Sequence, residues 1–168
     1  ARTVTRRARC GKPVAVVVFD LAGFKAINDS FGHDTGDAAL VAVAKRLSAA
    51  PVVAGCVRLG GDEFAAVLAP RRNMDWKIVL DVFSRRLCLP MFTNDGAVDI
   101  RVRLGAAVAT RADRDLPRLL TAADAVMYAA RRDEQTLGVV HGSAAYLSRP
   151  RSRARDDQDA ELVQTVTV

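Results

Sequence analysis

Residues 14–19 form an unbroken run of Val, Ala and Phe that ends in Asp20. A strand that is apolar at every position, rather than at every second one, is typical of a sheet covered on both faces. The run therefore predicts a central strand whose sheet carries helices on both sides. With 168 residues, half of them hydrophobic, the chain can bury one such core, and disorder throughout is excluded.

Glycines, prolines and apolar periodicity divide the rest of the chain into short elements. The helix expected at 75–89 has Ile78, Val82 and Leu89 among its apolar positions. The order β-α-α-β-β-α-β-α-β, with a hairpin at its centre, predicts an α/β sandwich of ferredoxin-like or polymerase-palm type, with helices around a mainly antiparallel sheet of about five strands. The other expected elements are helices at 23–28, 37–50 and 116–131, and strands at 52–58, 64–68, 98–108 and 137–140.

Charge and cysteine usage exclude several classes of protein. The chain carries 25 Lys and Arg against 19 Asp and Glu, and much of the excess lies in Arg-rich segments at 2–12 and 149–155. No aromatic residue interleaves with these arginines, so solvated ends are favoured over a nucleic-acid contact. Three cysteines without a CxxC spacing disfavour a disulfide framework or a zinc site. This cysteine usage fits a reducing compartment, so we expect a cytoplasmic location. No apolar run approaches the ~20 residues of a membrane span, so we expect no membrane contact.

Three acidic residues lie where they could meet. Asp20 follows the buried strand, and Asp62 and Glu63 lie in the glycine-rich turn, residues 59–63, of the predicted hairpin. If strand and hairpin are neighbours in the sheet, the carboxylates converge at one edge and could hold a pair of Mg²⁺ ions, which prefer oxygen ligands. The alternative is that Asp20 only ends its strand and the other two acids only serve the turn.

Four stretches of the chain resemble one known family. The heptapeptide RLGGDEF at 58–64 resembles the signature of the GGDEF family, the diguanylate cyclases. Residues 19–37 resemble the first block of that family, residues 104–105 a later strand, and residues 123–128 its late helix. These motifs occur in the family's order between residues 13 and 140, which makes chance similarity very improbable.

The resemblance implies roles in metal binding and proton transfer. Two Mg²⁺ or Mn²⁺ ions per active site would be held by Asp20, the Leu21 carbonyl and Asp62. Asp62, or Glu63 beside it, would help to deprotonate a ribose 3′-hydroxyl.

The resemblance also implies a nucleotide site. Asn28 and Asp37 would read the guanine edge, because an Asp carboxylate accepts hydrogen bonds from N–H groups that adenine lacks. Leu40 would line the base pocket, and His33 would support the loop rather than act as an acid or base. The triphosphate would be bound by the main chain and side chains at Phe24, Lys25, Gly60, Gly61 and Arg131. The turn glycines lack Cβ atoms, so their backbone can approach a phosphate closely.

The implied reaction joins two GTP molecules into cyclic di-GMP and releases two pyrophosphates. One domain holds one GTP, so a second copy of the chain must face the first as a homodimer. The implied catalytic domain covers residues 13–142, after a basic segment at 1–12 that ends a truncated helix or linker and before a tail at 143–168. Because the chain begins with Ala rather than Met, we expect a sensor or regulatory domain N-terminal to it.

The chain departs from the family pattern at four places. Ala22 replaces an acidic or amide residue, Arg131 replaces a Lys, and residues 134–136 replace Gly-Arg-Asn. Pro51 and Ala54 occupy the positions of a product-inhibition site, so no inhibitory site is expected. The family's usual N-terminal turn is also missing. These departures keep open a GTP-binding regulatory module with weak or no activity, whereas a palm-like nucleic-acid enzyme would need aromatic platforms for a strand.

Overall fold

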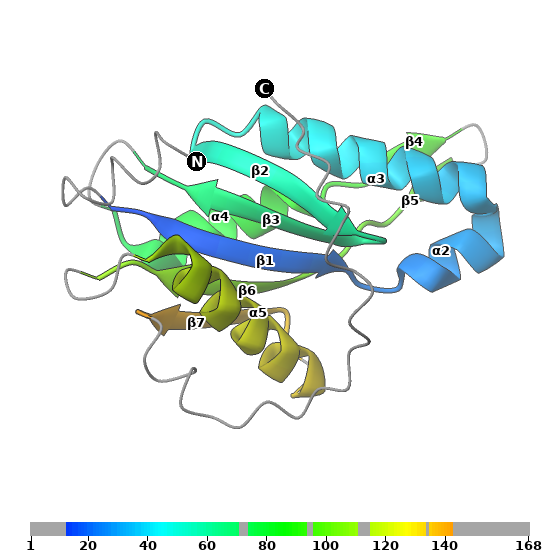
Figure 1. Cartoon of the computed structure of the whole chain (residues 1–168). Helices are drawn as coiled ribbons and strands as arrows, with labels where there is room; N and C mark the ends of the chain where they lie inside the picture. The colour runs from blue at the N-terminus through cyan, green and yellow to red at the C-terminus, as the bar shows by residue number, and fades with distance from the viewer. Residues whose placement is uncertain (1–12, 71–73, 94–95, 111–114, 134, 143–168) are drawn as a thin grey trace.

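A computed structural model describes residues 13–70, 74–93, 96–110, 115–133 and 135–142. Strand β1 (Ala15–Leu21) lies at the centre of a five-stranded sheet with the order β2-β3-β1-β6-β7 (Figure 1). Every residue of β1 is buried, which confirms the predicted central strand. The strands around it are antiparallel except for the parallel pair β6 and β7, so the mainly antiparallel sheet is also confirmed; they are β2 (Val53–Gly60), β3 (Glu63–Leu68), β6 (Val102–Val108) and β7 (Leu137–His141).

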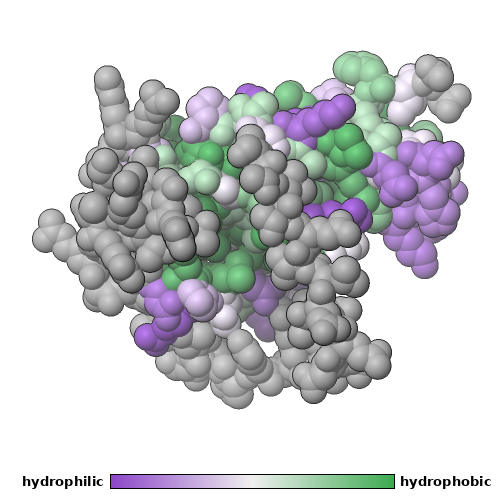
Figure 2. Space-filling view, turned by 45° about the horizontal axis from the view of Figure 1, so that its top comes forward, coloured by the Kyte–Doolittle hydropathy of each residue, from purple (hydrophilic) through white to green (hydrophobic). Residues whose placement is uncertain are grey.

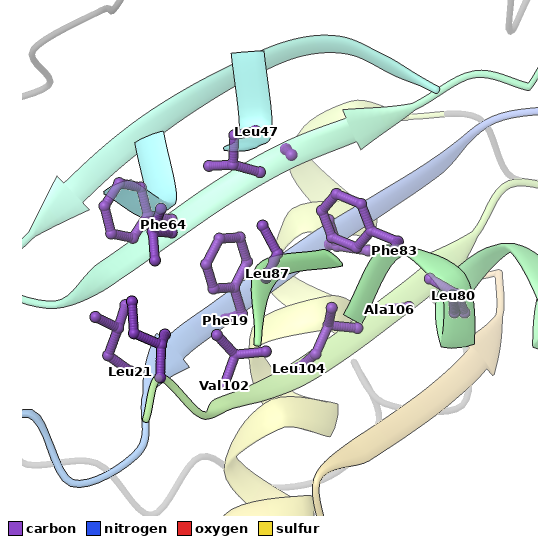
Figure 3. Close-up of a cluster of buried hydrophobic side chains, with 14 of the residues drawn as sticks. Phe19, Leu21, Leu47, Phe64, Leu80, Phe83, Leu87, Val102, Leu104 and Ala106 are labelled. Carbon is purple, nitrogen blue, oxygen red and sulfur yellow. The ribbon is translucent and has the colours of Figure 1, made fainter. Parts of the chain in front are cut away.

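Helices cover both faces of this sheet. Alternate β1 side chains point to opposite faces, so Phe19 packs with α3 and α4 whereas Val18 packs with α5. On the α3 and α4 side, Phe19 stacks on Phe64 with ring centroids 5.4 Å apart and meets Phe83 edge to face (Figure 3). The helices are α2 (Phe24–Phe31), α3 (His33–Ser48), α4 (Trp76–Leu87) and α5 (Leu116–Arg132).

The central hairpin is tighter than predicted. Its strands extend until only Gly61 and Asp62 separate them, where a turn at 59–63 was expected. Glu63 is therefore the first residue of β3, paired with Gly60, and not part of the turn. A positive φ of 52° at Gly61 explains the short connection, because this conformation is costly for residues with a Cβ.

The predicted strand at 98–108 is wrong in its N-terminal part. Residues 96–98 form β5 (Gly96–Val98), which pairs with the unpredicted β4 (Met91–Thr93) in a separate two-stranded sheet. Val102 starts β6 in the main sheet. Val98, Ile100 and Val102 are all buried, so the period-two pattern continues across the break and could not reveal it.

Three helices differ from the prediction. Helix α2 ends at Phe31, three residues later than expected. Helix α3 begins at His33 rather than at residue 37, because Gly32 alone, with a φ of 83°, separates it from α2. Helix α4 is shorter than predicted and presents a different face to the core. Its buried residues are Val79, Leu80, Phe83 and Leu87, whereas the apolar positions singled out from the sequence, Ile78, Val82 and Leu89, are more than half exposed.

The described residues cover most of the domain predicted at 13–142. The predicted N-terminal segment at 1–12 and the tail at 143–168, with their Arg-rich stretches, lie outside them. Among the residues that the structure describes, no helix combines the length and the apolar character needed to cross a bilayer.

Candidate active site

A row of three charged residues lies across the three central strands of the sheet, near one end of each strand. Asp20 in β1 is in register with Glu63 of β3 on one side and with Arg103 of β6 on the other. Cross-strand partners project from the same face of a sheet, and this is the face that α5 covers. Asp62 directly precedes Glu63 in the hairpin. The structure therefore brings the strand-end acid and the hairpin acids together, as the sequence predicted.

Asp20 has an unusual environment for a carboxylate. It is 4% exposed and is the only polar or charged residue classed as buried in the part of the chain that the structure describes. Its Oδ1 atom has no hydrogen-bond partner there. Arg131 at the end of α5 places Nη1 3.6 Å from Oδ2, and Arg103 places Nη1 4.0 Å from Oδ1. Both contacts are ion pairs longer than a good hydrogen bond, so the carboxylate keeps unused acceptor capacity.

The surroundings of Asp20 act on its pKa in opposite directions. Burial raises this pKa and is the largest influence, because it penalises the charged form. Arg103 lowers the pKa, as does Arg131 to a smaller extent, while Asp62 and Glu63 raise it. The influence of both hairpin acids indicates that their negative charges lie within electrostatic reach of Asp20. A bound cation would relieve the repulsion among these three groups.

This donor set fits a hard divalent cation. Carboxylate and main-chain oxygens are the ligands that Mg²⁺ and Mn²⁺ prefer, and the unpartnered Oδ1 of Asp20 is available to accept one. Among the described residues, no group of three or more His, Cys, Asp or Glu side chains is arranged to hold an ion by itself. Ions at this position would therefore take further ligands from the main chain, such as the Leu21 carbonyl, from water and from substrate phosphates.

The hairpin turn is held by its own arginine. The Arg58 guanidinium donates to the Gly61 carbonyl from Nε at 2.9 Å and from Nη2 at 2.6 Å. These bonds stabilise the turn next to Asp62 and occupy two of the five donors of Arg58. A Cβ atom at Gly60 or Gly61 would meet nothing within 4 Å, so the turn leaves open space beside its backbone.

A second orphaned oxygen lies between α2 and α3. Asn28 has a buried Oδ1 without a hydrogen-bond partner among the described residues, and this atom lies against Gly36. A Cβ atom at Gly36 would overlap the amide oxygen and would lie 3.4 Å from the Phe24 ring. Gly36 thus makes room for Asn28. Hydrophilic residues gather at this end of the molecule, over α2 and the start of α3 (Figure 2).

The remaining predicted site residues lie around these two centres. Lys25, His33 and Asp37 are exposed on α2 and α3, and Phe24 is half-buried at the start of α2. Leu40 is 5% exposed and belongs to the main hydrophobic cluster, against which Phe24 packs. Their predicted contacts with a nucleotide stay predictions.

The sequence reasoning missed Arg103. Its only sequence signal is a charged residue between the apolar Val102 and Leu104, which is ordinary for a strand with one partly polar face. Its importance comes from the register of β1 and β6, which places it beside Asp20. Arg131, predicted to bind phosphate, also lies beside this carboxylate.

Replacing Asp20 with asparagine should preserve or raise stability near neutral pH. A raised pKa means that folded Asp20 holds its proton more tightly than unfolded Asp20 does. The stabilisation from this proton is complete below the ordinary Asp pKa of ~3.9 and is lost as pH rises through the raised folded pKa. We therefore expect the stability of Asp20→Asn relative to wild type to increase from acid to neutral pH, measured by urea unfolding. A less stable variant at pH 7 would show that the arginine ion pairs outweigh burial.

Comparison with known proteins gives a consistent match. The family model described as "Diguanylate cyclase, GGDEF domain" matches residues 1–136. The chain is 32% identical over 131 residues to the bifunctional diguanylate cyclase/cyclic di-GMP phosphodiesterase MucR of Pseudomonas aeruginosa, covering 77% of this chain and 19% of MucR. It is 40% identical over 121 residues to an uncharacterized 19.3 kDa protein of Streptomyces ambofaciens, covering 70% of this chain and 63% of that one.

The fold has close solved counterparts. The crystal structure of diguanylate cyclase SiaD from Pseudomonas aeruginosa, in complex with its activator SiaC, superposes with a TM-score of 0.68 at 26% identity. The match covers 84% of this chain and 55% of the SiaD chain. The chain thus spans less than two thirds of the length of each of these three proteins.

Proposed function

Because the chain belongs to the GGDEF family of diguanylate cyclase domains, we propose that it condenses two GTP molecules into cyclic di-GMP. The observation that carries this proposal is the buried Asp20 carboxylate, with an unpartnered oxygen, beside the acids of the glycine-rich hairpin. A buried carboxylate with an unpartnered oxygen lowers the stability of the fold, so a functional role for it is expected. Binding of cations that neutralise a triphosphate supplies one.

The proposed reaction consists of two equivalent steps. In each, the 3′-oxygen of one GTP forms a bond to the α-phosphorus of the other. The bond from that phosphorus to the oxygen bridging the α- and β-phosphates breaks, and pyrophosphate leaves with the electron pair. The hydroxyl proton passes to the carboxylate of Asp62 or Glu63. After both steps the two nucleotides form a ring, and two pyrophosphates have been released.

The residues around Asp20 have different proposed roles in this reaction. Asp20, Asp62 and the Leu21 carbonyl would hold two Mg²⁺ or Mn²⁺ ions, which supply charge neutralisation at the attacked phosphate and the leaving group. Gly60 and Gly61 leave space where main-chain N–H groups can approach a phosphate. Lys25 and Arg131 carry the positive charge proposed to orient the triphosphate. Orientation and charge neutralisation supply most of the acceleration in phosphoryl transfer.

The α2–α3 junction is proposed to select guanine. The orphaned Oδ1 of Asn28 and the exposed carboxylate of Asp37 provide acceptors for N–H donors of the base. Adenine cannot supply the same donors, so ATP is expected to be a poor substrate. An Asp37→Ser variant should reduce the ratio of turnover with GTP to turnover with ATP.

Replacing Gly36 with alanine should weaken GTP binding while preserving the fold. The new Cβ overlaps the Asn28 amide, a movable side-chain end, and displaces it from its position. Alanine also favours the helix over glycine by up to ~1 kcal/mol. We expect GTP affinity to fall about tenfold, the value of one lost hydrogen bond in a shielded site. Calorimetric titration with a non-hydrolysable GTP analogue measures this.

The double variant provides the control for that prediction. In an Asn28→Ala background, Gly36→Ala should cause no further loss of affinity, because the displaced group is already missing. An additive second loss would show that Gly36 acts on the nucleotide independently of Asn28.

Turnover measured across protein concentration tests the proposed function. The protein with GTP and Mg²⁺ or Mn²⁺ should yield cyclic di-GMP and pyrophosphate in a 1:2 ratio. Because each copy is proposed to hold one GTP, specific activity should rise with protein concentration until the homodimer saturates. Binding of GTP without formation of cyclic di-GMP at any protein concentration would refute the proposed enzymatic activity.

That negative result would favour the second candidate, a GTP-binding regulatory module. Two observations favour this candidate: Arg103 and Arg131 already accompany the Asp20 carboxylate, and the exposed Gln135 stands where the family pattern has an arginine. An attached sensor domain is part of the proposal, since the match covers only 19% of MucR. A cytoplasmic location completes it.

A further inference from the structure

Arg103 is a built-in positive charge at the position proposed for a metal ion. Strand register places it directly opposite Asp20, and its Nη1 lies 4.0 Å from Oδ1, the same oxygen that lacks a hydrogen-bond partner. The contact neutralises part of the carboxylate charge without satisfying the oxygen. Such a pair is held by charge and strand geometry rather than by a directed hydrogen bond.

The two arginines at Asp20 are not equivalent. Arg131 is nearer, at 3.6 Å, but its side chain is 59% exposed at the C-terminal end of α5, where water screens its charge. Arg103 is 32% exposed and is anchored in a strand between two hydrogen-bonded neighbours. Arg103 is therefore the dominant internal counter-ion of this carboxylate.

A divalent cation bound at Oδ1 would come close to the Arg103 guanidinium. Two positive centres around one partly buried carboxylate repel each other, and the repulsion is strong because little water separates them. Arg103 must move away or lose part of its interaction when the ion binds. In either case the free energy of metal binding becomes less favourable by the free energy of the ion pair that is lost.

We infer that Arg103 competes with the divalent cation for Asp20 and thereby sets the metal affinity of the site. This inference rests on the metal site of the proposed function. A bound triphosphate shifts this competition towards the metal ion. Its phosphate oxygens add ligands for the ion and give the displaced guanidinium a new partner. The protein thus binds metal weakly alone and more tightly together with nucleotide.

Mn²⁺ binding without nucleotide provides the test. Free Mn²⁺ is quantified by its electron paramagnetic resonance signal during titration of the full chain, so no catalytic activity is needed. We expect Arg103→Met, which keeps an unbranched side chain but removes the charge, to bind Mn²⁺ about tenfold more tightly than wild type. Arg103→Gln provides a second variant with a polar end, in case methionine perturbs the strand, and both are checked by thermal melting.

Arg118→Met is the matched control. It removes the same charge from the other end of α5, 13 positions and thus roughly 20 Å from Arg131. Its Mn²⁺ affinity should equal that of wild type. Asp20→Asn should abolish the gain in the Arg103 variants. Equal Mn²⁺ affinity of wild type and both Arg103 variants would overturn this inference alone, whereas no binding by any of them would overturn the proposed metal site and the inference with it.

Discussion

Replacing Asp62 with alanine should abolish cyclic di-GMP formation, with a loss of about 10³-fold or more in turnover. Asp62 lies in the two-residue turn of the hairpin, within electrostatic reach of Asp20. In the proposed mechanism it both holds a metal ion and lies next to the attacking hydroxyl. Removal of the carboxylate eliminates both contributions at once. Chromatography of the nucleotide products and a pyrophosphate assay measure the effect.

The fold of this variant should be intact. Asp62 is half-buried in the hairpin turn and belongs to neither main hydrophobic cluster, so the free energy of unfolding should change by no more than about 0.5 kcal/mol. Asp81→Ala is the matched control, because Asp81 is an exposed acid on α4 whose partner is the surface residue Arg85. That variant should retain full turnover. Substantial product formation by Asp62→Ala would contradict the assigned role.

Replacing Gly105 with alanine should cause the largest loss of stability. Gly105 lies in the middle of β6, where α5 crosses the sheet at very close range. A Cβ atom there would overlap the Ala123 carbonyl oxygen and the Met127 amide nitrogen, and would lie 2.7 Å from the Met127 Cβ. Backbone atoms of a helix cannot rotate away as a side chain can. The whole helix must shift, at a cost of about 3 kcal/mol or more in the free energy of unfolding.

Urea unfolding of Gly105→Ala measures this loss, with Gly55→Ala as the control. Gly55 also lies in a strand, but a Cβ atom there meets nothing within 4 Å, so that variant should change stability by no more than about 0.5 kcal/mol. The displaced α5 also carries Arg131 away from Asp20, so residual activity should fall further than the folded fraction does. Similar stabilities for the two variants would show that α5 adapts without cost.

The sequence by itself determined the parts of the protein that depend on local patterns. A run that is apolar at every position predicts β1, and paired glycines between two apolar segments predict the hairpin. The order of the main elements follows from the same patterns. The acids that form the candidate site could be named in advance because they lie at the ends of these elements, where a sheet edge brings side chains together.

Only the tertiary structure decided which residues face each other. Both β5 and β6 lie within one alternating pattern, and only hydrogen-bonded pairing assigns them to different sheets. Helix α4 has apolar residues on more than one side, so packing against the sheet chose which side is buried. Register, likewise non-local, placed Arg103 beside Asp20. Periodicity reports the neighbours along a chain, whereas the charge around a buried carboxylate is set by residues from distant segments.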